Sequence, residues 1–408
     1  MVMSRFISFM IAAFLMSFLM HYYVWHRVIK ITALPRMIFL TFSGIIWSLF
    51  IALPLSMGIG RYFFSSDTGF FVLNLSFIWL GILYFLVMVL FIFECVYWAY
   101  YILFRILDLS FLEKKMYLIV KRVFAISSVL IATIGVSSGI HEVRKDVDVK
   151  QVKVKLPRFP ESLGGFKIIQ ISDFHIGMPL SKRDTVETVV KKINDLNPDL
   201  VVLTGDIVDG SVPTLKDIVA PIRNLKTKYG VFLATGNHEY YASAPDWIDE
   251  FSSLGIRMLL NESIVIGNQG AAFELAGIPD YNADKIMKTH EVDLGRTFKD
   301  HNPDLTTILI SHQPKIIYDL DKYDVGLVLS GHTHGGQIWP WGLLVHLTQP
   351  YIKGLHKYKG RTQVYVSQGT GYWGPPMRIG TKAEITLITI DRGEPPDCGE
   401  EKDNCDGS

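Results

Sequence analysis

The sequence lacks the basic stripe that marks a nucleic-acid-binding protein. Residues 1–140 hold 10 lysines and arginines and 4 acidic residues, whereas the whole chain holds 40 and 39, so residues 141–408 carry a net charge of −5. This mildly acidic balance argues against nucleic acid as a partner.

A signal-peptide cleavage site of the A-x-A type is also missing, and no twin-arginine pair precedes the first apolar run. Four apolar runs, each near the ~20 residues needed to cross a bilayer, lie at 6–25, 37–60, 70–94 and 123–140. The third continues to Phe104, which indicates a long or tilted helix or an interfacial extension. We therefore predict an uncleaved bundle of about four transmembrane helices in residues 1–140.

Lysines and arginines predict how these spans are oriented. Arg27, Lys30 and Arg36 follow the first span, and five basic residues between 105 and 122 follow the third, whereas the loop between the second and third offers only Arg61. The positive-inside rule places the two basic loops in the cytoplasm. We expect an integral protein of the cell membrane with both termini, and the domain that follows the spans, outside the cytoplasm.

Cysteine is scarce, with three in 408 residues. Cys95 lies in an apolar run and is interpreted as a small buried or lipid-facing side chain. Cys398 and Cys405 lie in the acidic tail at 396–408, whose composition is typical of a disordered segment. A disulfide in this tail and two unpaired thiols are both open, because spacing does not fix connectivity.

Residues 145–395 predict an α/β domain with strands in its centre and helices outside. In an opening strand near 147–156 the alternation of apolar and polar residues shifts once by one position, which a β-bulge would explain. Helical patterns occupy 183–196, 214–227 and 245–254. Short apolar runs that suit buried strands lie at 166–173, 199–206, 230–238, 271–277, 306–312, 325–332, 362–369 and 383–391.

Polar side chains gather at the ends of these runs. In α/β sheets ligands bind beyond the carboxyl ends of strands, so these residues are expected to converge on one crevice. Each short pattern alone is more often an ordinary turn, but their succession in this order indicates a metal site. The residues are Asp173, His175, Asp206, Asn237, His238, His312, His332 and His334.

The patterns themselves suit metal binding. Asp173 and His175 are two apart, hence on one side of an extended segment, and His332 and His334 repeat this spacing. Gly205 leaves room for other ligands to approach Asp206, whose two oxygens can each bind a metal. Asn237 offers a neutral carbonyl oxygen, and the adjacent His238 is free to face a substrate.

These motifs resemble the signature of the calcineurin-like metallophosphoesterase superfamily. The signature D-x-H, G-D-x-x-D, G-N-H-E, a lone His and G-H-x-H reads here DFH, GDIVD, GNHE, SH and GHTH, over about residues 150–391. GHTHGGQIWP and GTGYWGPPMRIGTKAEIT are similar to the YkuE/YaeI-like, membrane-associated bacterial branch, and the multi-span anchor resembles transmembrane proteins with a metallophosphoesterase domain. The resemblance implies two sheets packed as a β-sandwich flanked by helices.

The resemblance also implies the site. One metal would be bound by Asp173, His175, Asp206 and His334, and a second by Asp206, Asn237, His312 and His332. His238 would face the substrate, with Asp209 orienting it. Two divalent ions are implied, and the mixed nitrogen and oxygen ligands favour Mn, Fe or Zn. The implied reaction is attack on phosphorus by a metal-bridging hydroxide.

Departures from related families narrow the subclass and disfavour a protein phosphatase. Asp209 stands where purple acid phosphatases carry a tyrosine ligand, and the arginines of protein phosphatases are absent, because Ser211 follows Gly210 and Thr235 precedes Gly236. We expect a phosphodiester or pyrophosphate substrate, with lipid-linked or envelope components as candidates and membrane lipids as further partners. The oligomeric state stays open.

Two further hypotheses concern single features. Arg378 is either a contact for phosphate or a structural arginine at a turn. The segment at 338–360 mixes aromatic and basic residues, as a membrane interface does, although a buried loop with a solvated edge explains it equally well. Two other classes of protein compete with the enzyme: a non-catalytic envelope binding protein, and a transporter in which Glu94 is the main charged candidate.

Overall fold

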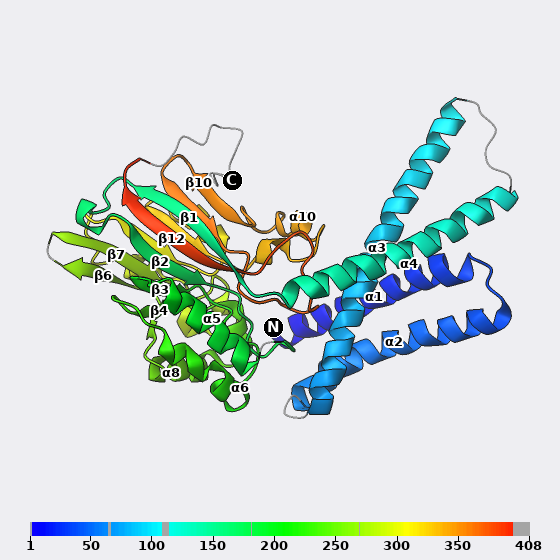
Figure 1. Ribbon diagram of the computed structural model, residues 1–408, viewed down its shortest axis with the longest axis horizontal. Coiled ribbons are helices and arrows are strands. Elements are labelled where there is room, and N and C mark those ends of the chain that lie inside the picture. Colours follow the sequence, from blue (N-terminus) through cyan, green and yellow to red (C-terminus); the bar gives the residue numbers. More distant parts are fainter. Residues whose placement is uncertain (1, 64–66, 108–113, 181, 269, 395–408) are drawn as a thin grey trace. The chain divides into compact units, whose positions relative to one another are not determined.

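The computed structural model describes residues 2–63, 67–107, 114–180, 182–268 and 270–394 (Figure 1). The chain divides into two compact units, one formed by 1–141 with 374–377 and the other by 142–373 with 378–408. The predicted tail at 396–408, with Cys398 and Cys405, lies outside the described residues.

The first unit is helical. Its elements are α1 (Val2–Val24), a π-helical turn (Trp25–Lys30), α2 (Arg36–Phe63), α3 (Asp67–Ile106) and α4 (Lys114–Val143). Where side chains are described, three helices are long and apolar enough to cross a membrane: Arg36–Ser56, Val72–Ile106 and Met116–Val143. They cover the predicted second, third and fourth spans, and the predicted first span coincides with α1. The third continues past residue 94, as the sequence indicated.

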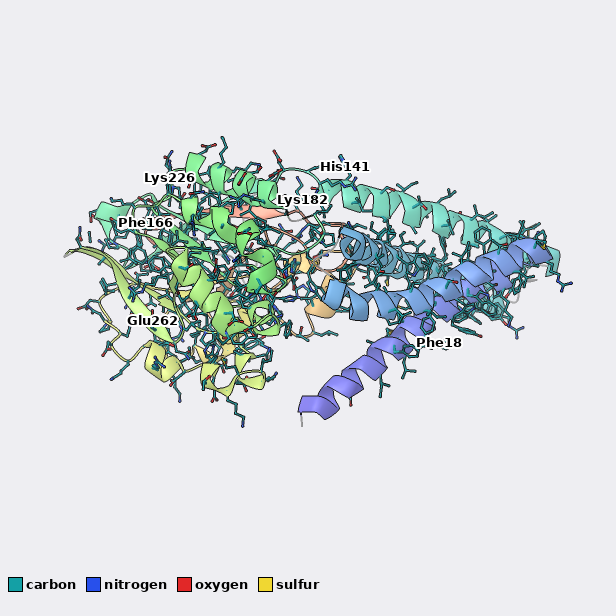
Figure 2. The ribbon with its side chains drawn as sticks, turned by 90° about the horizontal axis from the view of Figure 1, so that it is seen from below. Phe18, His141, Phe166, Lys182, Lys226 and Glu262 are labelled. Carbon is teal, nitrogen blue, oxygen red and sulfur yellow. The ribbon has the colours of Figure 1, made fainter. Side chains whose placement is uncertain are left out.

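Apolar side chains cover the outside of these helices. Phe18, labelled on α1 in Figure 2, is 39% exposed, and Cys95 on α3 is also exposed. Inside the unit, buried His21 has both ring nitrogens engaged, by the carbonyl oxygen of Ser17 at 2.7 Å and by Trp79 Nε1 at 3.0 Å. Glu94, the charge considered for transport, forms an ion pair with Arg27 at 2.5 Å.

The second unit is built on two six-stranded sheets. The first has the order β1 (Asp148–Leu156), β12 (Glu384–Arg392), β2 (Phe166–Ile171), β3 (Leu200–Leu203), β4 (Val231–Leu233) and β5 (Arg257–Met258). The second has the order β10 (Gly354–Tyr358), β11 (Thr362–Val366), β9 (Leu327–Ser330), β8 (Thr307–Ile310), β7 (Ala271–Gly277) and β6 (Glu262–Asn268). Strands β2 to β5 are mutually parallel, as are β7, β8, β9 and β11.

Helices cover the outer face of the first sheet: α5 (Arg183–Asp195), α6 (Val212–Val219) and α8 (Ala244–Ser253) (Figure 1). Val186, Val189, Val190 and Ile193 form the buried stripe of α5 that the sequence predicted. Short segments, α9 (Leu294–Thr297) and a 3-10 turn (Pro314–Asp319), pack beside the second sheet. The predicted two-sheet sandwich flanked by helices is therefore confirmed.

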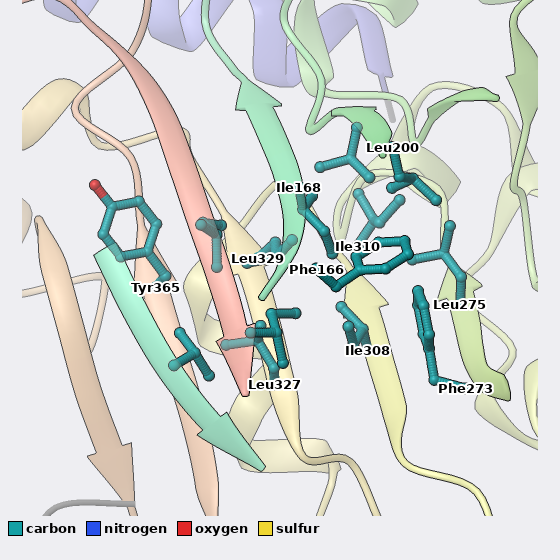
Figure 3. Packing of buried hydrophobic residues seen from close by; sticks show 14 of the residues in the cluster. Phe166, Ile168, Leu200, Phe273, Leu275, Ile308, Ile310, Leu327, Leu329 and Tyr365 are labelled. Atoms are coloured by element: carbon teal, nitrogen blue, oxygen red, sulfur yellow. The ribbon is translucent and has the colours of Figure 1, made fainter. Parts of the chain in front are cut away.

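The main core lies between the two sheets. Because strands β2 and β3 are buried on both faces, their side chains alternate between this core and the helix layer. Figure 3 shows Phe166, Ile168 and Leu200 of the first sheet packed against Phe273, Leu275, Ile308, Ile310, Leu327 and Leu329 of the second.

The predicted bulge in the opening strand is wrong. β1 pairs with β12 in unbroken register from Asp148 to Leu156. The alternation changes because Val149 packs against the helix layer, whereas Val152, Val154 and Leu156 point into the core between the sheets. One regular strand therefore contributes to two cores.

Candidate metal centre

All nine predicted site residues follow strands at one edge of the sandwich. Parallel strands bring their carboxyl ends to the same edge, which explains why residues distant in sequence meet here. Asp173 and His175 follow β2, Asp206 and Asp209 follow β3, Asn237 and His238 begin α7 (Asn237–Tyr241) after β4, His312 follows β8, and His332 and His334 follow β9.

One cluster contains Asp173, His175 and His334, whose ligand atoms lie within 4.8 Å of one another. The two imidazole Nε2 atoms are 3.0 Å apart, and Asp173 Oδ1 is 3.4 Å from that of His334. Asp209 Oδ2 lies 2.8 Å from His175 Nδ1 and accepts its hydrogen. The lone pair of His175 Nε2 is thereby directed into the cluster, because a carboxylate that holds the other ring nitrogen of a metal-binding histidine fixes its tautomer and orientation.

A second cluster contains Asp206, His312 and His332, again within 4.8 Å. His312 Nδ1 is 2.7 Å from the carbonyl oxygen of Thr204, which can only accept, so Nδ1 carries the hydrogen. In the neutral form of the ring, the lone pair of Nε2 then points toward Asp206 Oδ2, 3.1 Å away. A lone pair and a carboxylate oxygen repel each other at this distance unless a proton or a cation lies between them. These donors therefore fit a metal ion.

Two buried acceptors add to this fit. The side-chain oxygen of Asn237 and Nδ1 of His334 have no hydrogen-bond partner. Orphaned buried acceptors are rare and call for an explanation. Both atoms belong to residues that the sequence assigned to metals. A cation beside the second cluster would satisfy the Asn237 oxygen, whereas His334 faces the first cluster with Nε2 and not with Nδ1.

A third cluster joins His175, Asp209 and His238. Asp209 Oδ1 lies 2.6 Å from His238 Nδ1, while its other oxygen holds His175. Burial would raise the pKa of Asp209, but the two imidazoles outweigh it and lower the pKa to about 2. Burial would lower the pKa of His238, but the charges of Asp206 and Asp209 raise it to about 9. The contact of Asp209 with His175 was not anticipated from sequence.

The two histidines of the second cluster have pKa values shifted in opposite directions. Burial would lower the pKa of His312, yet the adjacent Asp206 carboxylate raises it well above its usual value. Burial, followed by the charge of His312, lowers the pKa of His332 to about 3. Burial also would raise the pKa of Asp206, but His312 and His238 hold it well below its usual range. At neutral pH one proton therefore sits on His312, where a metal would bind.

Binding of Mn²⁺ or Zn²⁺ should accordingly release protons at pH 7, the His312 proton among them. Because the pKa of His312 is raised, the proton must leave before the lone pair can bind. The apparent metal affinity should therefore rise about tenfold per pH unit below that pKa. Calorimetry in two buffers of different ionisation enthalpy measures the release. His312→Asn should release fewer protons, and a heat independent of the buffer would contradict the prediction.

The backbone at these positions is unusual. Asp173, His175, Asp206, His332 and His334 have positive φ angles of 49°, 50°, 52°, 71° and 51°. A non-glycine residue in this left-handed region costs ~1–3 kcal/mol unless its surroundings impose the conformation. The strain turns these side chains out of the strand direction and toward one another, and such strain concentrates at functional sites.

Two glycines allow the loops to approach closely. A Cβ atom on Gly331 would overlap Ser172 Oγ, and one on Gly236 would overlap Asp206 Oδ1. A side chain at either position would push the loop after β9 or β4 away from its neighbour. The glycines of the G-N-H-E and G-H-x-H patterns thus serve packing between ligand-bearing loops.

Glu239 is a site residue to which the sequence reasoning gave no role. Its buried carboxylate accepts hydrogen bonds from the backbone amides of Asp206 at 2.9 Å, Ile207 at 2.7 Å and Gly236 at 2.7 Å. It therefore ties the loop after β3 to the loop after β4. Its place as the last letter of G-N-H-E was the available signal.

Arg378 does not contact phosphate. Its side chain is buried, and burial lowers its pKa to about 10. The guanidinium donates to the carbonyl oxygens of Gln368 at 2.6 Å, Gly371 at 2.7 Å and His334 at 3.2 Å, and to Thr381 Oγ1 at 3.3 Å. The hypothesis of a phosphate contact is wrong, because these backbone groups use its donors. The arginine shapes the loops behind His334.

A cavity of about 240 Å³ opens beside the second cluster. Its lining includes Asn237 and His332 together with Asp280, Asn282 and Lys285. Asp280 is held by Gln313 Nε2 at 2.7 Å and by the amide of Asn282 at 2.9 Å. The cavity therefore gives access to two of the predicted ligands, Asn237 and His332.

Comparison with known proteins gives a consistent picture. A family model described as Calcineurin-like phosphoesterase matches residues 166–336. The Transmembrane protein with metallophosphoesterase domain of Bos taurus is 37% identical over 273 residues, which are 64% of this chain and 61% of that protein. The uncharacterized metallophosphoesterase YkuE of Bacillus subtilis is 30% identical over 254 residues, 60% of this chain and 85% of its own.

One relative is matched along almost its whole length. An uncharacterized metallophosphoesterase of Campylobacter jejuni is 31% identical over 389 residues, which are 94% of this chain and 98% of that protein. The similarity therefore includes the apolar helices as well as the domain that carries the three clusters.

Proposed function

This chain belongs to the calcineurin-like metallophosphoesterase family, and we propose that it is a membrane-anchored hydrolase that cleaves a phosphodiester or pyrophosphate bond. One observation carries the proposal: two clusters of histidine and carboxylate ligands lie beside a histidine that a partly buried carboxylate holds in place. Metal sites and an oriented acid group are the parts that phosphoryl transfer to water requires.

In this proposal two divalent cations, with Mn, Fe or Zn favoured by the ligand types, occupy the first two clusters. Asp173, His175 and His334 hold one, Asn237, His312 and His332 hold the other, and Asp206 is shared. When bound, such ions activate water and neutralise charge on the phosphoryl oxygens. Asp173, His175, Asp206, His312 and His334 are buried, which limits competition from water for the metals, and Asn237 and His332 are partly exposed.

His238 serves as the acid in this scheme. Its Nδ1 is engaged by Asp209 at 2.6 Å, so Nε2 is left to donate a hydrogen to the departing oxygen. The charges of Asp206 and Asp209 raise its pKa to about 9, which favours the protonated imidazole that an acid requires. Nε2 lies 4.0 Å from Asp206 Oδ2, which places the acid beside the second cluster.

The charge of the site favours a phosphoryl group with a single negative charge, as in a diester or in a pyrophosphate esterified at both ends, over a simple monoester. A monoester carries two negative charges on its terminal phosphoryl group, and enzymes that bind it often grip it with arginine. Arg378 donates to backbone carbonyls beside His334 and leaves no such grip. A phosphoryl group with fewer charges needs less compensation.

The catalytic domain is proposed to lie outside the cytoplasm. The basic loops at 27–36 and 105–122 favour the cytoplasmic side, which leaves the residues after α4 on the opposite side. Substrates would then be envelope or outer-leaflet components, with lipid-linked phosphoesters among them.

A metal-dependent substrate panel tests the function. The full chain, stripped with chelator and reloaded with Mn²⁺, Fe²⁺ or Zn²⁺, is assayed on bis-p-nitrophenyl phosphate, p-nitrophenyl phosphate, glycerophosphodiesters and lipid pyrophosphates. We expect diester or pyrophosphate cleavage that chelator abolishes and metal restores. A protein that binds its metals yet cleaves none of these substrates would instead support the non-catalytic binding protein.

A further inference from the structure

An exposed apolar ridge lies in the loop between β9 and β10. Trp339, Trp341, Leu343, Leu344 and Leu347 are 56%, 49%, 68%, 52% and 79% exposed. These five residues, here named the apolar crest, fall within nine positions and include part of the short helix α10 (Gly342–Val345). Single exposed leucines are ordinary on protein surfaces, but a contiguous group marks a surface that contacts something.

The chemistry of the crest matches a lipid surface. Tryptophans concentrate at the boundary between lipid and water, and leucines favour the acyl chains beneath. Exposed Lys353 follows the crest closely and is suited to lipid phosphates, whereas Lys359 is already paired with Asp321 at 2.5 Å. A surface that binds another protein would more often surround such an apolar patch with a polar rim.

The segment just before the crest is joined by two hydrogen bonds to Trp373, a neighbour of His238. The Gln337 side chain donates to the carbonyl oxygen of Trp373 at 2.7 Å and accepts from the Trp373 amide at 2.9 Å. Trp373 is 52% exposed, and its ring centroid lies 5.9 Å from that of His238. An apolar side chain therefore stands directly beside the proposed acid and is fixed to the segment that begins the crest.

The apolar helices of the chain place the domain next to a membrane. The last candidate span ends at Val143, and β1 begins at Asp148, so four residues connect them. The domain is consequently tethered close to a bilayer surface, and a lipid layer is the apolar phase permanently available to its exposed side chains.

We propose that the apolar crest inserts into that lipid surface and that the substrate is an amphiphilic phosphoester, which passes Trp373 to reach His238. The inference rests on the proposed phosphoesterase function for its substrate, but the insertion can be observed separately. The phosphoryl group would enter the metal centre while the acyl or alkyl part stays with the crest and the lipid.

Insertion is tested with the full chain in phosphatidylglycerol nanodiscs. Its native cysteines are replaced by serine, and one new cysteine at a time, Leu343→Cys or Leu347→Cys, carries an environment-sensitive fluorophore. The matched control is Val265→Cys on β6, 60% exposed and at the opposite edge of the second sheet from β10. Brominated lipids should quench the crest labels and leave the control unaffected. Crest labels quenched no more than the control would overturn the proposal.

Substrate choice is tested with two diesters that share one leaving group, ethyl and hexadecyl p-nitrophenyl phosphate. We expect kcat/KM for the hexadecyl ester to exceed that for the ethyl ester at least tenfold. The double variant Leu343→Asp, Leu347→Asp should lose that advantage and keep its activity on the ethyl ester, while Val265→Asp should behave as the wild type. Equal use of both esters by the wild type would overturn the inferred substrate but leave the phosphoesterase function standing.

The remaining outcomes are also distinct. If neither ester is hydrolysed by the metal-loaded protein, the proposed function fails, and lipid quenching alone decides whether the crest inserts. If crest labels are shielded without lipid quenching, a second copy or another protein covers the ridge, and the inference is wrong.

Discussion

The Asp206→Asn protein should hydrolyse bis-p-nitrophenyl phosphate at least ~1,000-fold more slowly than the wild type, a loss of about 4 kcal/mol in transition-state stabilisation. The fold should survive the change. Oδ1 accepts from the His238 amide at 2.8 Å, and an asparagine oxygen can do the same. The new amide nitrogen can donate to His312 Nε2, which lies 3.1 Å from Oδ2. The effect is therefore loss of the charge that both predicted metals would share.

The measurements are kcat, bound metal and the midpoint of thermal unfolding. Asp249→Asn, an exposed acid on α8, removes one charge from the same domain and should leave all three unchanged. Less metal in the Asp206→Asn protein would agree with the shared-ligand role. Wild-type turnover by a folded Asp206→Asn protein would refute the assignment of this residue and, with it, of the centre.

The loss of activity in the His238→Ala protein should depend on the leaving group of the substrate. Cleavage of a glycerophosphodiester, which expels an alkoxide, should fall by ~10²–10⁴-fold, because the departing oxygen needs a proton. Cleavage of bis-p-nitrophenyl phosphate should fall much less, since p-nitrophenolate leaves without one. Parallel kcat measurements on the two substrates give the ratio, and bound metal should be unchanged because His238 is not a predicted ligand.

The pH profile gives a second readout of the same role. An acid acts only when protonated, so wild-type kcat on the alkyl diester should decline as pH rises through the pKa of His238. That pKa is about 9, and bound cations nearby would lower it, so the decline is expected no higher than about pH 9. The decline should be absent in His238→Ala. An equal loss with both leaving groups would point to a structural role instead.

Most of the fold could be predicted because the central strands are short, uninterrupted apolar runs. The strands missed, β5, β6 and β10, are three of the four edge strands of the two sheets. An edge strand has only one neighbour and leaves part of its side chains to solvent, as the exposed Val265 of β6 shows. Its sequence therefore carries no continuous apolar run to recognise.

The centre was predictable as a set of residues but not as an arrangement. Order along the chain and position at strand ends indicated which side chains would meet. The hydrogen position on His312 depends on the Thr204 carbonyl, 108 residues away. Left-handed backbone at Asp173 or His332 leaves no mark in the sequence, since neither residue type requires it. Metal binding by these residues stays a prediction for the measurements above.

Arg378 shows the limit of motif reasoning in the other direction. A lone arginine near a phosphoesterase motif suggests an anion contact. The sequence pattern does not show, however, which backbone carbonyl groups need a hydrogen-bond donor in the folded protein. The loop from Gln368 to Gly371 turns its carbonyl oxygens inward, and a buried donor with a fixed fork meets several of them at once. Only the folded chain reveals that demand.

The strand order also constrains biosynthesis. β12, which ends at Arg392, lies between β1 and β2, so the first two strands to leave the ribosome are separated by one of the last. The first sheet cannot close until more than two hundred further residues have been translated, and until then β1 and β2 expose unpaired edges. A nascent chain halted in that interval should be the species most in need of chaperones, long after its membrane helices have been made.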